Sequence, residues 1–400
     1  MRSSTAAAPA RVRLWPMYVG GFLGPFGGLV VVPMLPEVAA AFGTSVQTVA
    51  WSLTVYTLPL ALLMQVSGTL ADVWGRARTV RAAYLVYAAA SLACAAAPST
   101  ELFFGARMLQ GSANAFTTPL LVAALYDAVA RERLGRSLGR FGGMQAAGMA
   151  FAPLAGGLAG ALDWRLGFVA IAAVAGALAL VPPRAAHRAP AQAGSLLQRW
   201  RSLGNVRLVR ACAVALLFNL TAAGAVLLIS LLAADRFGLG PGQRGLVIAC
   251  YGAAGLLLSP VLGHLVDRYG PRRTGIGVFA LLAGVVAAAA WAPSVAALAV
   301  ASALSGAAAT GSRVVVNSLS VTSTPANPGG AASMTMSWLF LGSALAPLLF
   351  LPAYSHAVVV GFLLTASAAA AASILAVPRL APPVPMAVDD EAAAITAVHE

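Results

Sequence analysis

The chain has 400 residues, of which 60% are hydrophobic and only 9% charged, and its formal net charge is +13. A mean hydropathy of +0.85 is too apolar for a soluble globular domain of this length. The composition therefore predicts a polytopic membrane protein. No basic segment is interleaved with aromatic residues, so nucleic acid is not expected as a partner.

Twelve apolar runs follow one another along the chain. Each has roughly the 19 to 25 residues that a helix needs to cross a bilayer, where only a helix or a closed barrel satisfies the backbone. The fold class is therefore predicted to be all-α, with twelve transmembrane helices. The first run follows a basic segment without a convincing cleavage site, so we expect it to be a retained helix. The runs begin near Met17, Val46, Thr79, Glu101, Leu138, Trp164, Val209, Gly242, Thr274, Ser294, Ala331 and Ser355.

The basic residues predict the orientation in the membrane. All 25 are arginines, and with the N-terminus in the cytoplasm twenty of them lie on that side. Arg165, Arg236 and Arg244 then lie outside, and Arg107 and Arg313 lie within spans. By the positive-inside rule we expect a protein of the cell membrane with both termini in the cytoplasm. The net charge is explained by this topology and by contact with anionic lipid headgroups of the bilayer.

The second half of the sequence resembles the first. Sliding the chain by 195 residues lays Tyr56 on Tyr251 and "GTLADVWGRAR" on "GHLVDRYGPRR", and at an offset of 194 "GMAFAPL" matches "GSALAPL". We therefore predict two pseudo-symmetric six-helix bundles, residues 16–182 and 209–378. The remaining segments are expected in the cytoplasm: the N-terminus 1–15, the linker 183–208 and the tail 379–400.

Two parallel six-helix repeats with three motifs resemble the major facilitator superfamily over nearly the whole chain. Gly68 to Arg78 is similar to its G-x-L-x-D-x-x-G-R-[RK]-x-[RK] loop between helices 2 and 3, with Ala77 as a departure. "RMLQG" from Arg107 is similar to R-x-x-Q-G of helix 4. "GMAFAPLAGG" from Gly148 resembles the helix 5 motif G-x-x-x-G-P-x-x-G-G of the family's exporters, with Ala152 in place of a glycine. Three motifs in register indicate this fold strongly.

The loop motif predicts a conformational latch. Asp72 can accept hydrogen bonds from a helix N-terminus or pair with an arginine. We expect a cluster with Arg76, Asp127 and Arg131 to hold the halves together while the site faces outward and to break on inward opening. Alternatively the arginines only anchor the topology, and for Arg81 we favour that explanation. The predicted latch comprises Gly68, Asp72, Gly75, Arg76, Arg78, Asp127, Gly263, Asp267, Gly270 and Arg273.

Helix 4 carries the first charge inside the membrane. Arg107 lies about two turns into the span, where a charge costs at least about 2.5 kcal/mol, so it should face the bundle interior and have a partner. Other polar residues share its face, and we expect this stripe to line the central cavity: Gln110, Asn114, Thr117 and Thr118. Weaker candidates for the pathway are Gln145, Asn219, Tyr251, Ser302, Ser305, Arg313, Asn317, Thr335 and Trp338.

Most of these weaker candidates have a plainer explanation. A lone polar residue in a helix more often packs or hydrogen-bonds than contacts a ligand, and Arg313 could reach the interface along its aliphatic stem. In helix 5, Gly148, Gly156, Gly157 and Gly160 form a small-residue ridge suited to helix contact. Pro153 is expected to bend this helix and help to seal one end of the cavity. The alternative is a packing ridge without a role in transport.

Coupling to protons needs a group that changes protonation, which arginine does not do. Of the twelve acids none lies clearly in mid-membrane, and Glu37, at the outer end of helix 1, is the remaining candidate. Partial burial is expected to raise the pKa of the Glu37 carboxyl group, whereas a nearby Arg107 is expected to lower it. The alternative is a solvated carboxylate at a helix end.

These features favour a proton-coupled exporter of small amphipathic compounds that works by alternating access. The chain has no lysine, so a P-loop is excluded, and its four histidines have no metal spacing. We therefore expect no enzyme activity, no metal and no cofactor besides the proton gradient, and a monomer in a lipid bilayer. Two alternatives remain: an importer of an organic anion or other small nutrient, and a membrane sensor or scaffold without transport.

Overall fold

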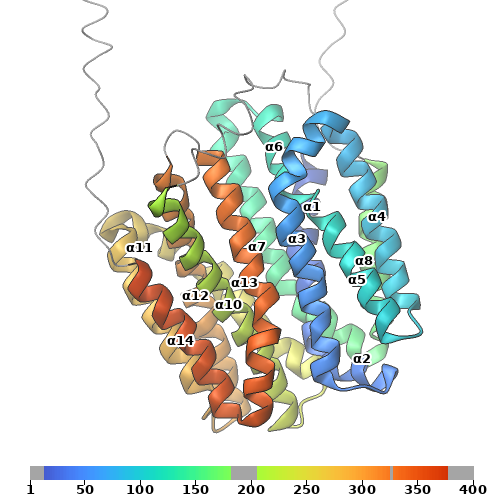
Figure 1. Cartoon of the computed structure of the whole chain (residues 1–400), viewed down its shortest axis with the longest axis vertical. Helices are drawn as coiled ribbons and strands as arrows, with labels where there is room; N and C mark the ends of the chain where they lie inside the picture. Colours follow the sequence, from blue (N-terminus) through green and yellow to red (C-terminus); the bar gives the residue numbers. More distant parts are fainter. Residues whose placement is uncertain (1–12, 182–204, 325–327, 377–400) are drawn as a thin grey trace, which may run out of the picture.

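The structure, a computed structural model, describes residues 13–181, 205–324 and 328–376, and all regular elements in these ranges are helices (Figure 1). In the N-terminal half they are α1 Trp15–Leu29, η1 Val32–Met34, α2 Leu35–Phe42, α3 Val46–Trp74, α4 Arg76–Ala96, α5 Thr100–Asn114, α6 Thr118–Ala128, α7 Arg131–Leu162 and α8 Arg165–Leu180. In the C-terminal half they are α10 Val206–Asp235, α11 Pro241–Ala289, α12 Val295–Ser323, α13 Pro328–His356 and α14 Val358–Ala376.

The all-helical membrane fold predicted from the sequence is confirmed. Within the described ranges, ten helical segments are long and apolar enough to cross a membrane, and α11, which is kinked at Gly270, supplies two of them, Pro241–Val266 and Arg268–Ala289. The helix α8 is shorter, and the fourth crossing is divided into α5 and α6. The predicted span starts at Val46 and Trp164 lie within a residue of α3 and α8. Most of the predicted linker and the tail lie outside the described residues.

The internal repeat is visible in the backbone. The glycines with positive φ form two pairs, each separated by the sequence offset of 195: Gly43 and Gly238, both with φ 62°, and Gly75 with φ 87° and Gly270 with φ 79°. Residues other than glycine rarely adopt this backbone conformation, so each pair of glycines marks the same turn in both halves. Gly75 turns the chain between α3 and α4, and Gly270 forms the kink within α11.

Two crossings of the N-terminal half are interrupted. Pro33 and Pro36 lie where α1 gives way to η1 and α2, and Pro119 starts α6 after the break at residues 115–117. Proline has no backbone N–H and collides with the carbonyl one turn earlier, so a regular helix does not continue through it easily. At the break in the fourth crossing, Thr117 Oγ1 donates to the backbone oxygen of Asn114 at 2.8 Å. Such a bond competes with helical hydrogen bonds.

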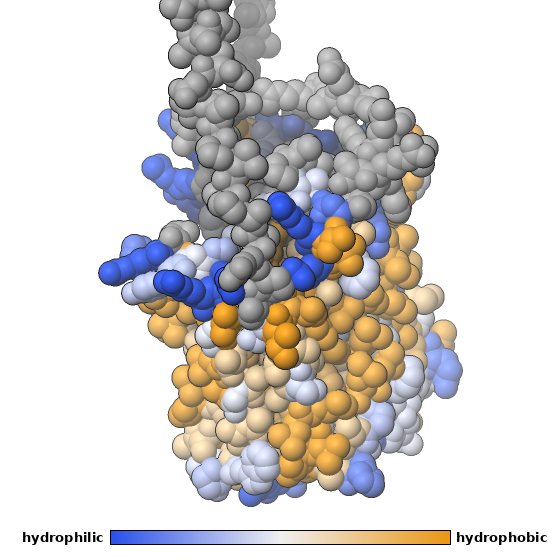
Figure 2. Space-filling view, turned by 60° about the vertical axis from the view of Figure 1, so that its left-hand side comes forward, coloured by the Kyte–Doolittle hydropathy of each residue, from blue (hydrophilic) through white to orange (hydrophobic). Residues whose placement is uncertain are grey.

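The crossings run between two ends of the bundle. We call the end with Trp15, Trp74 and Ala376 the terminal face, and the end with Phe42 and His356 the far face (Figure 1). Orange apolar side chains cover the middle of the molecule, and the blue polar groups gather toward its ends (Figure 2). This is the distribution expected for a protein embedded in lipid. The halves pack mainly through α7 against α11 and α3 against α13.

Candidate gate and polar core

An ion pair joins the two halves at the far face. Arg244, in the first turn of α11, donates through Nη2 to both carboxylate oxygens of Glu37 on α2, each at 2.5 Å. The Arg244 side chain is 5% exposed and that of Glu37 26% exposed. A charge-assisted pair at this depth is among the stronger polar contacts in a protein, because little water competes for it.

Arg244 also binds the interrupted part of helix 1. Its Nε donates to the backbone oxygen of Pro33 at 2.9 Å, and its Nη1 donates to the backbone oxygen of Leu239 at 3.1 Å. Nearby, Ser230 Oγ of α10 donates to the backbone oxygen of Val32 at 3.3 Å. The break in helix 1 exposes carbonyl groups that a continuous helix would use internally. The C-terminal half binds these carbonyls, so the break forms part of the seal.

The helix 5 motif packs tightly at the same end. A side chain added at Gly156 would meet the backbone of Val30, and one added at Gly157 would meet the backbone of Pro241 in the other half. A side chain at Gly245 of α11 would likewise meet the carbonyl of Pro153. Gly148 lies against the backbone of α1. The small residues therefore permit backbone contact of α7 with helix 1 and with α11, as glycines do between membrane helices.

The terminal face is different. Among the described residues, the remaining hydrogen bonds between the halves are those from Thr54 Oγ1 to the oxygen of Ala344 at 2.7 Å and from Ser337 Oγ to the oxygen of Ala61. Ala61 lies about midway along α3, and no such bond lies nearer the terminal face. Glycines of α7 near that face have no heavy atom within 4 Å of an added Cβ: Gly139, Gly142 and Gly143. The halves are thus joined at the far face and in the middle.

Arg107 lies inside the N-terminal bundle and is fully buried. Its Nη1 donates to the backbone oxygen of Gly27 at 3.1 Å and to Gln110 Oε1 at 2.5 Å. Its guanidinium carbon lies 4.2 Å from the centre of the Tyr56 ring and 5.9 Å from that of Phe168. Its Nε and Nη2 have no hydrogen-bond partner in the described structure. No carboxylate pairs with this charge among the described residues.

A chain of polar side chains extends from Arg107 through the bundle. Gln110 donates to Ser91 Oγ at 2.7 Å, and Asn114 donates to the Tyr56 hydroxyl at 2.8 Å. The Tyr56 and Tyr87 hydroxyls lie 3.4 Å apart. Gln110 is fully buried and Asn114 is 5% exposed. In this structure the face of Arg107, Gln110 and Asn114 is covered by α1, α3 and α4, so it borders no open space, and the expected role in lining the central cavity stays a prediction. Thr118 is half-buried.

Within the described residues, the polar candidates of the C-terminal half form no hydrogen-bonded network with one another. Arg313 is half-buried, with its guanidinium carbon 5.7 Å from the centre of the Phe218 ring, and Asn317 is exposed. Asn219 donates to the backbone oxygen of Leu339 at 2.8 Å, and Tyr251 is 8% exposed. In the other half, Gln145 is half-buried. The structure gives these five residues no bond to one another, and most have the packing environment of ordinary helix residues.

The predicted latch residues meet within one half. Arg76 Nη1 lies 2.6 Å from Asp127 Oδ2, and Arg76 Nη2 lies 3.0 Å from Asp72 Oδ1. Every partner that the structure gives to this cluster belongs to the N-terminal half. It is intact in this structure, in which the described terminal ends of the halves share no hydrogen bond, and its rupture on inward opening stays a prediction. Nothing packs within 4 Å of a Cβ added at Gly68, Gly75, Gly263 or Gly270. Arg78 and Arg273 are exposed, and the side chain of Asp267 lies outside the described part.

The sequence did not predict the partner of Glu37. We expected Arg107, but Arg107 binds Gly27 and Gln110, and Arg244 binds Glu37. The sequence positioned Arg244 only as an arginine on the outer side. Glu37 and Arg244 both lie at outer ends of predicted spans, in different halves of the chain. This common depth in the membrane was the signal in the sequence that could have suggested the pair. No group of histidine, cysteine and acidic residues suited to a metal occurs among the residues described.

Comparisons with known proteins agree with this architecture. A family model described as "Major Facilitator Superfamily" matches residues 17–240 and 211–397. A bacterial homolog of the human lysosomal transporter Spinster, solved in an inward-facing and unoccupied conformation, is similar over 91% of this chain and 94% of its own, with a TM-score of 0.70 and 14% identity. A variant of the nucleoside transporter NupG is similar over 91% of this chain and 98% of its own, with a TM-score of 0.74 and 14% identity.

Curated relatives are similar over shorter stretches. The probable actinorhodin transporter of Streptomyces coelicolor is 28% identical over 194 residues, which are 45% of this chain and 33% of that protein. The puromycin resistance protein pur8 of Streptomyces alboniger is 34% identical over 171 residues, 41% of this chain and 34% of that protein. A multidrug resistance protein B homolog of Mycobacterium tuberculosis is 35% identical over 127 residues, 32% and 24% of the two chains. The matches thus span about a quarter to a third of these relatives.

Proposed function

Since the chain belongs to the major facilitator superfamily, we propose that it exports small amphipathic compounds across the cell membrane by alternating access, driven by protons. The single observation that carries this proposal is the uneven junction between the halves. Buried polar contacts join them at the far face, and no hydrogen bond joins them at the terminal face among the described residues. A transporter caught with one side sealed has this arrangement.

Export and the substrate class are supported by the relatives. Three of them are named for actinorhodin transport, puromycin resistance and multidrug resistance. The small-residue contacts of α7 with helix 1 and α11 agree with the resemblance of this helix to the exporters' motif. By the positive-inside count, the terminal face is cytoplasmic and the far face is external. Substrate then enters from the cytoplasm while the Glu37–Arg244 pair seals the outside.

Glu37 is our proposed proton-coupling group. An acid paired with an arginine of the other half links protonation to conformation, because a neutral carboxyl no longer holds the guanidinium with charge. Protonation of Glu37 from outside would stabilise the separated far face, and loss of the proton would favour the sealed form. Breaking a buried, hydrogen-bonded charge pair costs about 2–5 kcal/mol, which is enough to shift a two-state equilibrium by one or more orders of magnitude.

The test is substrate-dependent proton flux in liposomes containing the purified protein, with puromycin as the first probe. Antiport predicts that puromycin movement in one direction drives protons in the other. Glu37→Gln should still bind puromycin but should not accumulate it against a gradient. Proton flux in the same direction as the substrate would contradict export by antiport. Wild-type accumulation by Glu37→Gln would exclude Glu37 as the coupling group.

A second candidate function is the transport of an organic anion, and Arg107 is the observation that favours it. Two of its donors are buried without a partner, and a substrate carboxylate would satisfy both in a bidentate fashion. In the liposome assay, salicylate serves as the probe for this function. Proton flux that accompanies salicylate but not puromycin would favour it over drug export. A protein that moves neither probe nor protons would agree with a sensor or scaffold.

A further inference from the structure

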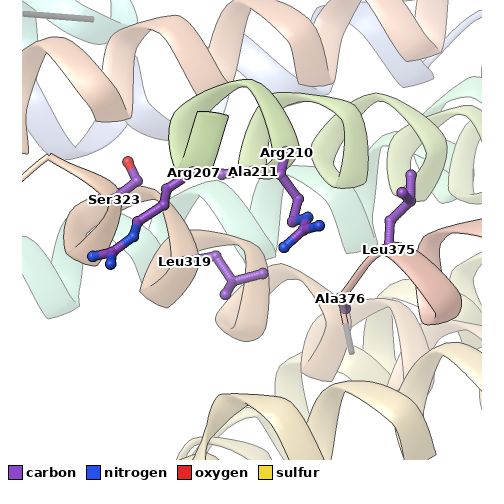
Figure 3. A pocket seen from close by; sticks show the side chains of 7 residues that line it. All are labelled: Arg207, Arg210, Ala211, Leu319, Ser323, Leu375 and Ala376. Atoms are coloured by element: carbon purple, nitrogen blue, oxygen red, sulfur yellow. The ribbon is translucent and has the colours of Figure 1, made fainter. Parts of the chain in front are cut away.

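The C-terminal half has two arginines without protein partners at the terminal face. Arg207 and Arg210 lie in the first two turns of α10, both are exposed, and the structure shows neither a hydrogen bond nor an ion pair for them within the described residues. They border a shallow groove formed by α10, α12 and α14. The other lining residues are Ala211, Leu319, Ser323, Leu375 and Ala376. In Figure 3 the two guanidinium groups extend on either side of Leu319.

The three helices that form the groove supply no carboxylate at this end. No aspartate or glutamate occurs in α12 or α14, and the one acid of α10 is Asp235 at the opposite end. Asp235 accepts a hydrogen bond from Tyr354 at 2.9 Å. Residues 182–204, which precede α10, contain no acid either. The partially positive end of α10 adds to the positive potential, so the groove favours an anion from outside the protein.

The groove is held in a fixed shape at its base. Asn205 caps α10 by accepting from the backbone N–H of Leu208 at 2.7 Å. The same side chain donates to Thr324 Oγ1 at 2.9 Å and to the backbone oxygen of Ser323 at 3.3 Å. One residue therefore fastens the beginning of α10 to the end of α12. Arg207 lies two positions later, so its backbone is positioned in advance of any ligand.

The surroundings indicate a lipid as the source of the anion. Apolar side chains adjacent in sequence to the arginines or to the lining residue Leu375 are widely exposed: Val206 by 78%, Val209 by 58% and Ile374 by 72%. Such side chains favour contact with acyl chains, while guanidinium groups at the same level suit the phosphates of the headgroups. We propose that this groove binds the phosphate headgroup of an anionic phospholipid, with Arg207 and Arg210 as its ligands and the leucines beside its acyl chain.

The proposal does not depend on what the protein transports, and it is tested by binding. Purified full-length protein is examined by native mass spectrometry with phosphatidylglycerol and with phosphatidylcholine. Each basic residue near an anionic surface contributes roughly a factor of five to affinity. Arg207→Gln/Arg210→Gln is therefore expected to lower the affinity for phosphatidylglycerol at least about tenfold and to leave that for phosphatidylcholine unchanged.

The matched control is Arg136→Gln/Arg140→Gln, which removes two exposed arginines of α7 from the same side of the membrane. This variant should retain the wild-type preference for phosphatidylglycerol. Equal losses in both variants would mean that only the overall charge matters and would overturn the site. Retained binding by Arg207→Gln/Arg210→Gln would overturn it as well.

Two further arms identify the occupant. Millimolar inorganic phosphate should not displace phosphatidylglycerol, because free phosphate lacks the acyl chains; full displacement would assign the groove to a free anion. The acids Asp389, Asp390 and Glu391 of the chain are an alternative occupant. Asp389→Asn/Asp390→Asn/Glu391→Gln should bind phosphatidylglycerol as the wild type does. A large increase in its affinity would show that these acids occupy the groove and would contradict the lipid.

Discussion

The two halves share one scaffold but differ in the helices nearest the polar core. At the offset of 195, the span of α5 and α6, Thr100–Ala128, corresponds to α12, Val295–Ser323. The first is interrupted and the second is continuous. Helix 1 is likewise divided into α1, η1 and α2, whereas its counterpart α10 runs unbroken from Val206 to Asp235. The breaks lie at or just before Pro33, Pro36 and Pro119, where the C-terminal half has Leu and Val residues.

The residues inside the two halves also differ at matching positions. The positions of Arg107, Gln110 and Asn114 are occupied in the second half by Ser302, Ser305 and Ala309. Tyr87 and Ser91 correspond to Leu282 and Val286. The N-terminal half thus has a buried network around a charged residue beside broken helices, whereas the buried polar side chains of the C-terminal half at these positions are small and uncharged. A buried charge and helix breaks both cost stability, so we expect substitutions in the core of the N-terminal half to affect transport more than those at the matching positions of the C-terminal half.

The largest expected effect comes from removing the buried charge. Arg107→Ala should abolish both binding and accumulation of substrate. Arg107→Met, which retains the volume, should also abolish transport without lowering thermal stability, because two donors of Arg107 are already unpartnered and their burial is costly. The measurements are uptake into vesicles and a thermal shift at matched expression. Arg313→Met is the control and should lose less; an equal loss would remove the distinction between the halves.

A smaller effect is expected at the terminal face. Asp127→Asn removes the closer partner of Arg76, and Asp72→Asn removes the other. Each should insert normally but reduce transport severely, by about tenfold, since one charge-assisted hydrogen bond contributes roughly 1.5 kcal/mol. The repeat partner Asp267→Asn should have a milder effect. Transport assays at matched expression decide this, and near-normal rates in all three variants would contradict a role for the cluster.

The smallest effect concerns the paired prolines. Pro153 of α7 corresponds to Pro347 of α13 at the offset of 194, and only Pro153 belongs to the helix 5 motif. Pro153→Ala should leave a folded protein with a raised proton leak, because a straighter helix would shift the carbonyl of residue 153 that packs against Gly245. Pro347→Ala should leak less. Identical leaks, measured with a pH-sensitive dye in liposomes, would mean that the motif proline has no special part in sealing.

Hydrophobic run lengths were sufficient to predict most of the fold. The apolar runs located the spans because lipid imposes length and composition on each helix, and the glycine pairs at the offset of 195 agree with the repeat seen in the sequence. The break in helix 4 was missed, although Thr118 and Pro119 in mid-span were its visible signal. Helical periodicity correctly grouped Arg107, Gln110 and Asn114 on one face.

What periodicity could not determine was where that face points. A polar face suits a buried network as well as a cavity wall, and only the packing of α1, α3 and α4 against it decides between them. The same limit applies to Glu37. Its partner Arg244 is separated by 207 residues in sequence, and their contact depends on how the halves are docked. Local sequence has no information on that docking.

The central claim is that the Glu37–Arg244 pair holds the far face closed, and a distance measurement across that face tests it most directly. Spin labels are attached at Ala41→Cys of α2 and Ala296→Cys of α12, with the native cysteines replaced, and distances are measured by pulsed electron paramagnetic resonance in liposomes. The account predicts one short distance in the wild type and an added longer population in Glu37→Gln. Glu37→Arg/Arg244→Glu should return part of that population to the short distance. An unchanged distribution in Glu37→Gln would contradict the account.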